Sequence, residues 1–274
     1  MVKGNIACFL TSGYTEAGEM QHFLRKINDA YTYHQCFPNK TKKKKGGERQ
    51  LSSVYSGLTG QDLIDRAVKI MREHPEYADK YDAILVEDDL DCRYKDKSEE
   101  EIEIEYNDNA RILREAFGRD VPVVFLYASP EIESWFISDW NNCFCGVYGD
   151  STYVPDLSKE NRDLFLIRLH DIIKKEIVQD DIERFGYGDT KYTKMSEKLT
   201  QIFSPDYIQS AIMDRNRDSK EVYDIVCQSR SLFYSKRTHG SAMLRKADPE
   251  IIQRSCRNFF RKGFLYLNGL SDAI

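Results

Sequence analysis

Short apolar runs alternate with amphipathic helical stretches over the first half of the chain, and this alternation is the strongest constraint on the fold. The runs NIACFL (5–10), DAILVE (82–87) and VPVVFLYA (121–128) have the length and composition of buried strands. Strands that alternate with helices predict an α/β fold with a doubly wound, mainly parallel sheet.

Stretches with helical periodicity fill the intervals between these runs. Apolar side chains recur at helical spacing over residues 20–27, 59–73 and 106–117. Thr59 is the expected N-cap of the second stretch, and Gly118 is expected to end the third. The acidic segment SEEEIEIE, which precedes the third helix, is expected to be solvated.

A further helix is predicted directly after the third strand, over residues 130–140. Pro130 is expected in its first turn, where a missing N–H removes no helical hydrogen bond. Trp135 and Trp140 lie on the apolar face of this helix, which indicates core residues rather than a platform for stacked bases.

The pattern changes to helices alone near residue 154. We therefore predict an α/β domain over residues 1–154 and a mostly helical, basic C-terminal region over residues 155–274. The net charge is −5, but residues 1–183 carry 24 Lys and Arg against 35 Asp and Glu, whereas the rest carries 16 against 10. An acidic body joined to a basic tail suits a metal site beside a surface for polyanions, although basic helical faces are often only solvated.

Acidic side chains follow all three predicted strands. They are Glu16 after the first strand, Asp88, Asp89 and Asp91 after the second, and Glu131 and Glu133 after the third. The carboxyl ends of parallel strands converge at one edge of the sheet, about 5 Å apart, so these carboxylates would repel one another unless a cation lay among them. Oxygen ligands of this kind favour Mg²⁺ or Mn²⁺.

Within this set, Asp89 and Asp91 are the preferred metal ligands. Residues two apart on a strand share a face, so Leu90 between them is expected to point into the core. Glu16 would act as a ligand or general base, and Asp88 would have a supporting role.

Glu131 and Glu133 cannot both face the same way on a helix. Glu131 is more readily accounted for as a first-turn acid at the positive end of the helix than as a ligand.

The segment ILVEDD resembles the opening of a response-regulator receiver domain, which binds Mg²⁺ beside a phosphorylated aspartate. Two features disfavour that interpretation. A strand and a helix precede this segment, whereas in receivers it is the first strand. The next strand is followed by Ser129, where receivers need an aspartate.

A better resemblance is to the Toprim superfamily, the metal-binding fold of topoisomerases, bacterial primases and nucleases of the overcoming-lysogenization-defect type. The matching residues are Gly13 with Glu16 three positions later, the Asp89-Leu90-Asp91 triplet, and the acids after the third strand. The phrases ASPEIESWFISDW (128–140) and YSKRTHG (234–240) also resemble a little-characterised bacterial Toprim-like family found among phage-defence genes. The first phrase implies Glu133, rather than Glu131, as the metal ligand.

One position departs from the Toprim pattern. The glutamate that the family carries directly before the glycine is Ser12 here, and a hydroxyl does not supply that charge. Either Asp88 or Glu133 compensates beside Glu16 and the Asp-x-Asp pair, or the site has lost its activity.

The resemblance implies a Mg²⁺- or Mn²⁺-dependent nuclease that cleaves phosphodiester bonds of DNA or RNA, as an effector of anti-phage defence. It also implies a partner ATPase or sensor subunit, and assembly with copies of the same chain is compatible with it. The alternative is a non-catalytic Toprim-fold subunit that regulates a defence complex or binds nucleic acid, which Ser12 favours. The choice between DNA and RNA stays open.

Clustered basic residues are the expected nucleic-acid contacts. Lys42, Lys43, Lys44 and Lys45 lie in a glycine-bearing loop over residues 39–56, and Lys191, Lys194, Lys236, Arg237 and His239 lie in polar turns beside tyrosines. Such residues would contact phosphates while neighbouring rings stack on bases. The alternative is a solvated surface, with His239 as a surface or helix-end residue rather than a general acid.

Several classes of protein are disfavoured by the composition. The sequence contains no run of 18 apolar residues that would predict a membrane span. The apolar stretch in the N-terminus MVKGNIACFL is too short for a signal peptide. We therefore expect a cytoplasmic protein without membrane association. The seven cysteines lack a disulfide or zinc-site spacing, and no phosphate-binding loop of the G-x-x-x-x-G-K-[ST] type is present.

Overall fold

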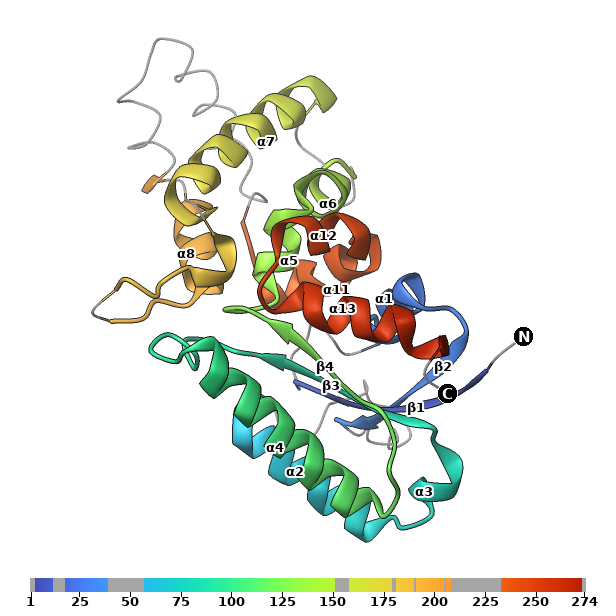
Figure 1. The fold of residues 1–274 in the computed structure, drawn as a ribbon. Coiled ribbons are helices and arrows are strands. Elements are labelled where there is room, and N and C mark those ends of the chain that lie inside the picture. Colours follow the sequence, from blue (N-terminus) through green and yellow to red (C-terminus); the bar gives the residue numbers. More distant parts are fainter. Residues whose placement is uncertain are drawn as a thin grey trace, which may run out of the picture.

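The sheet at the centre of the protein consists of four parallel strands in the order β2-β1-β3-β4. The strands are β1 (Gly4–Leu10), β2 (Tyr31–Phe37), β3 (Ala83–Asp89) and β4 (Val123–Ala128). The computed structural model describes residues 3–11, 18–38, 57–150, 158–178, 181–189, 191–204, 206–207 and 233–272. The parallel α/β architecture predicted from the alternating pattern is therefore confirmed (Figure 1).

Helices cover both faces of this sheet. Helices α2 (Gly60–Glu73) and α4 (Glu99–Phe117) lie side by side on one face, and α1 (Met20–Ile27) packs on the other with helices from the end of the chain (Figure 1). Period-two alternation divides the strand residues between the two cores, since Ile6, Cys8 and Leu10 face the α1 side and Ala7 and Phe9 face the α2 side. The sheet is thus doubly wound.

Helix α4 begins earlier than the apolar periodicity indicated. Its first turn is the acidic segment expected to be solvated outside the helix. Ser98 accepts a hydrogen bond from the Glu101 backbone N–H, and the Glu101 side chain accepts one from the Ser98 N–H, which makes a capping box. Acidic residues in a first turn also interact favourably with the helix dipole. Gly118 ends the helix in the left-handed conformation, as predicted.

Strand β2 was not predicted. It is an edge strand, and the tyrosines, His34 and Gln35 in YTYHQCF give a weaker apolar signal than the central strands. Pro130 also differs from expectation, because α5 (Glu133–Ser138) begins three residues later. The Pro130 carbonyl instead accepts a hydrogen bond from the Asp91 N–H and so joins the ends of β3 and β4.

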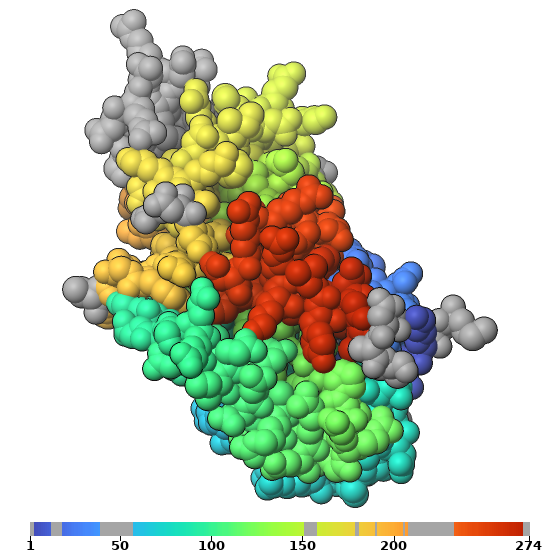
Figure 2. All heavy atoms as spheres, in the orientation of Figure 1, coloured from blue at the N-terminus to red at the C-terminus, as the bar shows by residue number. Residues whose placement is uncertain are grey.

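The described part of the C-terminal half is mostly helical. Its helices are α6 (Gly146–Tyr148), α7 (Lys159–Ile173), α8 (Met195–Ile202), α11 (Lys236–Lys246), α12 (Pro249–Ser255) and α13 (Phe260–Asn268), and the short α3 (Tyr77–Lys80) precedes β3. The described α-helices that follow α5 share one hydrophobic core with α1, α5 and the sheet. The predicted division at residue 154 lies outside the described residues, but the two halves pack together (Figure 2).

The two halves approach each other closely at Gly263 of α13. A Cβ atom at this position would lie 2.2 Å from the backbone oxygen of Phe125 in β4. The helix therefore rests directly on the strand backbone, which only a residue without a side chain allows. Among the described residues, no helix is long and apolar enough to cross a membrane.

Gly263→Ala should destabilise the protein, because either α13 or β4 must move to admit the methyl group. We expect a loss of about 1–3 kcal/mol in the free energy of unfolding, measured by urea denaturation. Gly269→Ala is the matched control at the end of the same helix, where a Cβ would meet nothing within 4 Å. Equal stability of the two variants would contradict the packing of α13 on β4.

Candidate functional site

The acidic residues at the end of β3 point to opposite faces of the sheet. Asp89 faces the C-terminal helices, where its Oδ1 accepts a hydrogen bond from the Ile132 N–H and its Oδ2 lies 3.3 Å from Lys236 Nζ. Asp88 faces α2, where both carboxylate oxygens accept the Gly60 N–H. The strand alternation therefore separates two adjacent aspartates.

Asp88 is paired on its own side of the sheet and does not join the other acids. Its Oδ2 lies 2.8 Å from the Arg93 guanidinium. Burial raises the pKa of Asp88 to about 6, although this guanidinium opposes the rise. The supporting role predicted for Asp88 at a shared metal site is not favoured by this position.

Leu90, between Asp89 and Asp91, points into the core, as predicted. Its side chain is buried in the core on the α2 side. The chain then leaves the strand direction at Asp91, which has a φ of 48° in the left-handed region. This turn brings the Asp91 carboxylate to the same cleft as Asp89.

Lys236 joins the carboxylates of Asp89 and Glu133. Its Nζ lies 3.3 Å from Asp89 Oδ2 and 3.4 Å from Glu133 Oε2. The Glu133 side chain is fully buried, and its Oε1 accepts a hydrogen bond from the Tyr234 hydroxyl at 2.8 Å. Glu133 is the glutamate that the sequence favours as a ligand. The Lys236 ammonium group lies between its carboxylate and that of Asp89.

Lys194 joins the second pair of carboxylates. Its Nζ lies 3.5 Å from Asp91 Oδ1 and 3.9 Å from Glu131 Oε1. Glu131 also accepts hydrogen bonds from the backbone N–H and the hydroxyl of Ser196 at the start of α8. Burial opposes protonation of Lys194, but the Asp91 and Glu131 carboxylates outweigh it and raise the pKa of Lys194.

An open cleft of about 790 Å³ lies over these residues, except for the fully buried Glu133. Asp89, Asp91 and Glu131 line it from the carboxyl ends of the strands, and Lys194, Lys236 and Arg237 add positive charge. Glu131 itself has a raised pKa, about 7, because of burial and then because of the carboxylates of Glu133 and Asp89. The four acids therefore interact with one another electrostatically, as the convergence of strand ends predicted.

The remaining predicted site residues lie in several places. Lys191 is exposed, and Arg237 lines the cleft. His239 is buried against Tyr148, and burial lowers its pKa to about 4, so the side chain is neutral and does not reach the surface. Glu16, Ser12 and Lys42 to Lys45 lie outside the described residues.

Two features of the site were not predicted from the sequence. Lys236 was expected to contact nucleic acid, but its ion pairs with buried acids depend on a contact between residues 147 positions apart. Thr11 was not considered, although its hydroxyl donates to the Glu87 carbonyl and accepts from the Asp89 N–H. A threonine directly after a strand is the only sequence signal for it.

The atoms that could coordinate a metal ion in the cleft are of the type that a hard divalent cation prefers. All are carboxylate oxygens, which Mg²⁺ and Mn²⁺ prefer. Within the described ranges, Glu133 Oε2 and Asp91 Oδ1 are buried and accept no hydrogen bond, so each could take a metal ion in place of the nearby ammonium group. In the same part of the chain, however, no three His, Cys, Asp or Glu side chains are already arranged around one point.

Comparison with known proteins does not place the chain in a family. Searches of protein-family models, curated proteins and solved structures give no significant match.

The raised pKa of Glu131 makes the stability of the protein depend on pH. A glutamate in the unfolded chain ionises near pH 4.5, whereas the pKa of Glu131 in the folded protein is about 7. The folded state therefore holds an extra proton between these values. Its contribution to the free energy of unfolding is full below pH 4.5 and is lost as the pH rises through 7.

The free energy of unfolding of the wild-type protein should fall between pH 5 and pH 8 as Glu131 ionises. In Glu131→Gln this fall should be smaller by on the order of 2 kcal/mol. Urea denaturation in the presence of EDTA measures this decline. Glu197→Gln is the control, because Glu197 lines the same cleft but is exposed. A wild-type pH dependence in Glu131→Gln would show that Glu131 ionises normally in the folded protein.

Proposed function

We propose that the protein is a Mg²⁺- or Mn²⁺-dependent nuclease whose active site is the acidic cleft at the carboxyl ends of β3 and β4. The observation that carries this proposal is the convergence of Asp89, Asp91 and Glu131 in one cleft that also carries cationic side chains, with the buried Glu133 joined to Asp89 through Lys236. Excess buried carboxylate beside surface lysine and arginine suits a cation that bridges the protein to a phosphodiester.

Asp89 and Asp91 would hold the cation, with Glu133 close behind Asp89 and with Glu16 expected from the first strand. When bound, a divalent ion polarises the phosphate and lowers the pKa of a water molecule. Arg237 and Lys191 would bind the flanking phosphates of the strand, where cationic side chains contact the backbone without reading sequence.

Lys194 and Lys236 must move for the cation to bind. The carboxyl groups of Asp89, Asp91, Glu131 and the buried Glu133 are paired with only two ammonium groups, so the acids outnumber their lysine partners. The Lys194 side chain is about half exposed and the Lys236 side chain is 25% exposed, so both can extend toward solvent. Released from the acids, the two ammonium groups would be available for substrate phosphates.

A second function is favoured by the same lysines. A lysine ammonium group already lies between the carboxylates of each pair. Within the described chain, no three His, Cys, Asp or Glu side chains are placed so that they could hold a metal ion. A non-catalytic subunit that binds nucleic acid or regulates a complex would retain such an arrangement as part of its fold. Ser12, in place of the Toprim glutamate, supports this alternative.

The biological role that we propose rests on the Toprim resemblance. That resemblance rests on Asp89, Leu90 and Asp91 at and after the end of β3, and on Glu131 and Glu133 after β4. A role in anti-phage defence, with an ATPase or sensor subunit as partner, follows by analogy with the Toprim-like families. Such a partner would restrain a nuclease that is toxic to its own cell.

Calorimetric titration with Mn²⁺ tests the metal site. We expect the wild-type protein to bind the ion, and the double variant Asp89→Asn with Asp91→Asn to bind it at least about tenfold more weakly. Asp120→Asn is the control, because this carboxylate is 97% exposed and precedes β4 at the opposite end of the strand. Equal binding by all three proteins would exclude Asp89 and Asp91 as ligands.

Cleavage assays test turnover. Plasmid DNA, single-stranded DNA and RNA should be cut in Mg²⁺ or Mn²⁺ and left intact in EDTA, and Asp89→Asn should lower the rate about a hundredfold or more. Asp120→Asn should cut at the wild-type rate. Intact substrates with every ion, together with binding of nucleic acid in EDTA, would support the non-catalytic subunit.

A further inference from the structure

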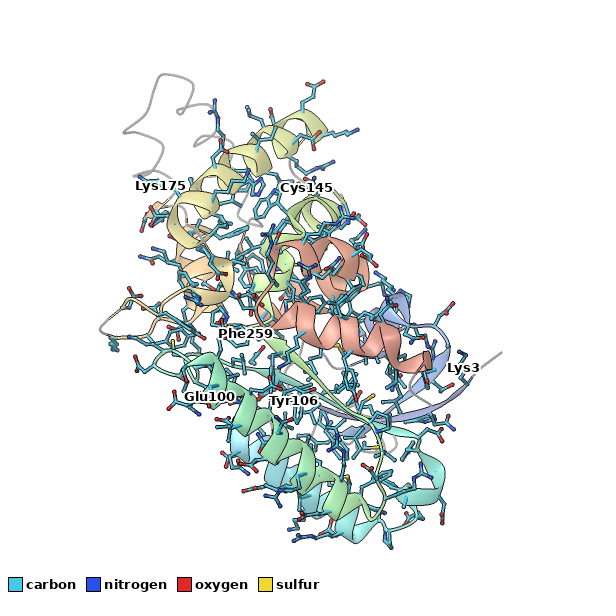
Figure 3. The ribbon with its side chains drawn as sticks, viewed as in Figure 1. Lys3, Glu100, Tyr106, Cys145, Lys175 and Phe259 are labelled. Carbon is cyan, nitrogen blue, oxygen red and sulfur yellow. The ribbon has the colours of Figure 1, made fainter. Side chains whose placement is uncertain are left out.

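A second concave site lies away from the acidic cleft, on the α4 side of the sheet. It is a groove of about 420 Å³ between the first turns of α4, the start of α13 and the short helix Ile182–Arg184. The face shown in Figure 2 includes the seam where the red C-terminal helices meet the blue-green segment that leads into α4. Figure 3 labels Tyr106 of α4 and Phe259, which precedes α13, on the two sides of this seam.

The floor and walls of the groove are aromatic. They consist of Tyr94, Tyr106, Phe125, Tyr127, Tyr187 and Phe259. Tyr94 and Phe259 stack with ring centroids 5.8 Å apart and an interplanar angle of 28°. Tyr106, Tyr187 and Phe259 are only partly buried, so each presents a ring to the groove. A flat ring can therefore be accommodated against existing ring faces.

Positive charge surrounds these rings. Lys95, Lys97, Arg184, Arg257 and Lys262 line the groove. Three of them pair with carboxylates: Lys97 with Glu105, Arg184 with Asp181 and Lys262 with Glu103. Lys95 Nζ donates to the Asp189 carbonyl and Arg257 Nε donates to the Arg254 carbonyl, and among the described residues neither side chain is in an ion pair. The Lys262 ammonium lies 4.8 Å from the centroid of the Tyr106 ring.

We propose that this groove binds a nucleotide, with the base against the aromatic rings and the phosphate on Arg257 and Lys95. Base stacking on aromatic side chains tolerates any base, and cationic side chains bind the phosphate. A purely apolar ligand would leave the cations unused, and an inorganic anion would leave the rings unused. The ligand that uses both is an aromatic base that carries phosphate.

The groove is independent of the proposed nuclease site. The turn after β3 separates them, with Asp91 in the acidic cleft and Tyr94 in the groove. The groove contains no cluster of carboxylates, so it indicates binding without catalysis. Either a free nucleotide or the exposed end of a single strand has the required chemistry.

Isothermal titration at physiological salt tests the proposal, with AMP, adenosine, inorganic phosphate and a single-stranded oligodeoxyadenylate as probes. We expect AMP to bind at least about tenfold more tightly than adenosine or phosphate alone. Arg257→Ala should weaken AMP binding about tenfold. Phe259→Leu, which keeps an apolar side chain but removes the ring, should weaken AMP and adenosine alike.

Arg261→Ala is the matched control, because Arg261 is exposed on the same segment and does not line the groove; AMP binding should be unchanged. Tighter binding of the oligonucleotide than of AMP would identify a strand end as the ligand, and equal binding a free nucleotide. Failure of both to bind would overturn the proposal. So would loss of AMP binding in Arg237→Ala but not in Arg257→Ala, since that would place the nucleotide in the acidic cleft.

Discussion

Neutralisation of buried carboxylates at the end of β3 is the constraint on which the rest of the site depends. The buried Asp89 carboxylate has two donors, the Ile132 N–H and the Lys236 ammonium. The first donor fixes the chain after β4, and the second fixes the start of α11. Glu133 and Tyr234 complete the same network. One strand end thus holds together segments that are far apart in the sequence.

The same electrostatics determine what the cleft can do. A lysine between two carboxylates stabilises the fold, but it also occupies the position in which a divalent cation would be most strongly attracted. Binding of a cation therefore competes with Lys194 and Lys236 rather than filling an open site. The proposed nuclease and the alternative regulatory subunit differ in which positive charge the acids bind, a divalent cation or the two lysines.

Local patterns predicted the central strands, the helices between them, the core position of Leu90 and the burial of Trp135 and Trp140, because each depends on neighbouring residues. Strand β2 was missed because an edge strand needs fewer apolar residues. The early start of α4 could have been predicted from Ser98 and Glu101, which have the spacing of a capping box. Lys236 between Asp89 and Glu133, and burial of His239, could not, since both depend on long-range packing of α11.

The central claim is that Asp89 and Asp91 form a cation site in which a metal displaces lysine. The most direct measurement is the anomalous scattering of crystals grown with Mn²⁺. The account predicts one or two Mn²⁺ peaks bonded to carboxylate oxygens of Asp89 and Asp91, with the Lys236 ammonium withdrawn from Asp89. A cleft without Mn²⁺, in which Lys236 still joins Asp89 to Glu133 and Lys194 still joins Asp91 to Glu131, would contradict it.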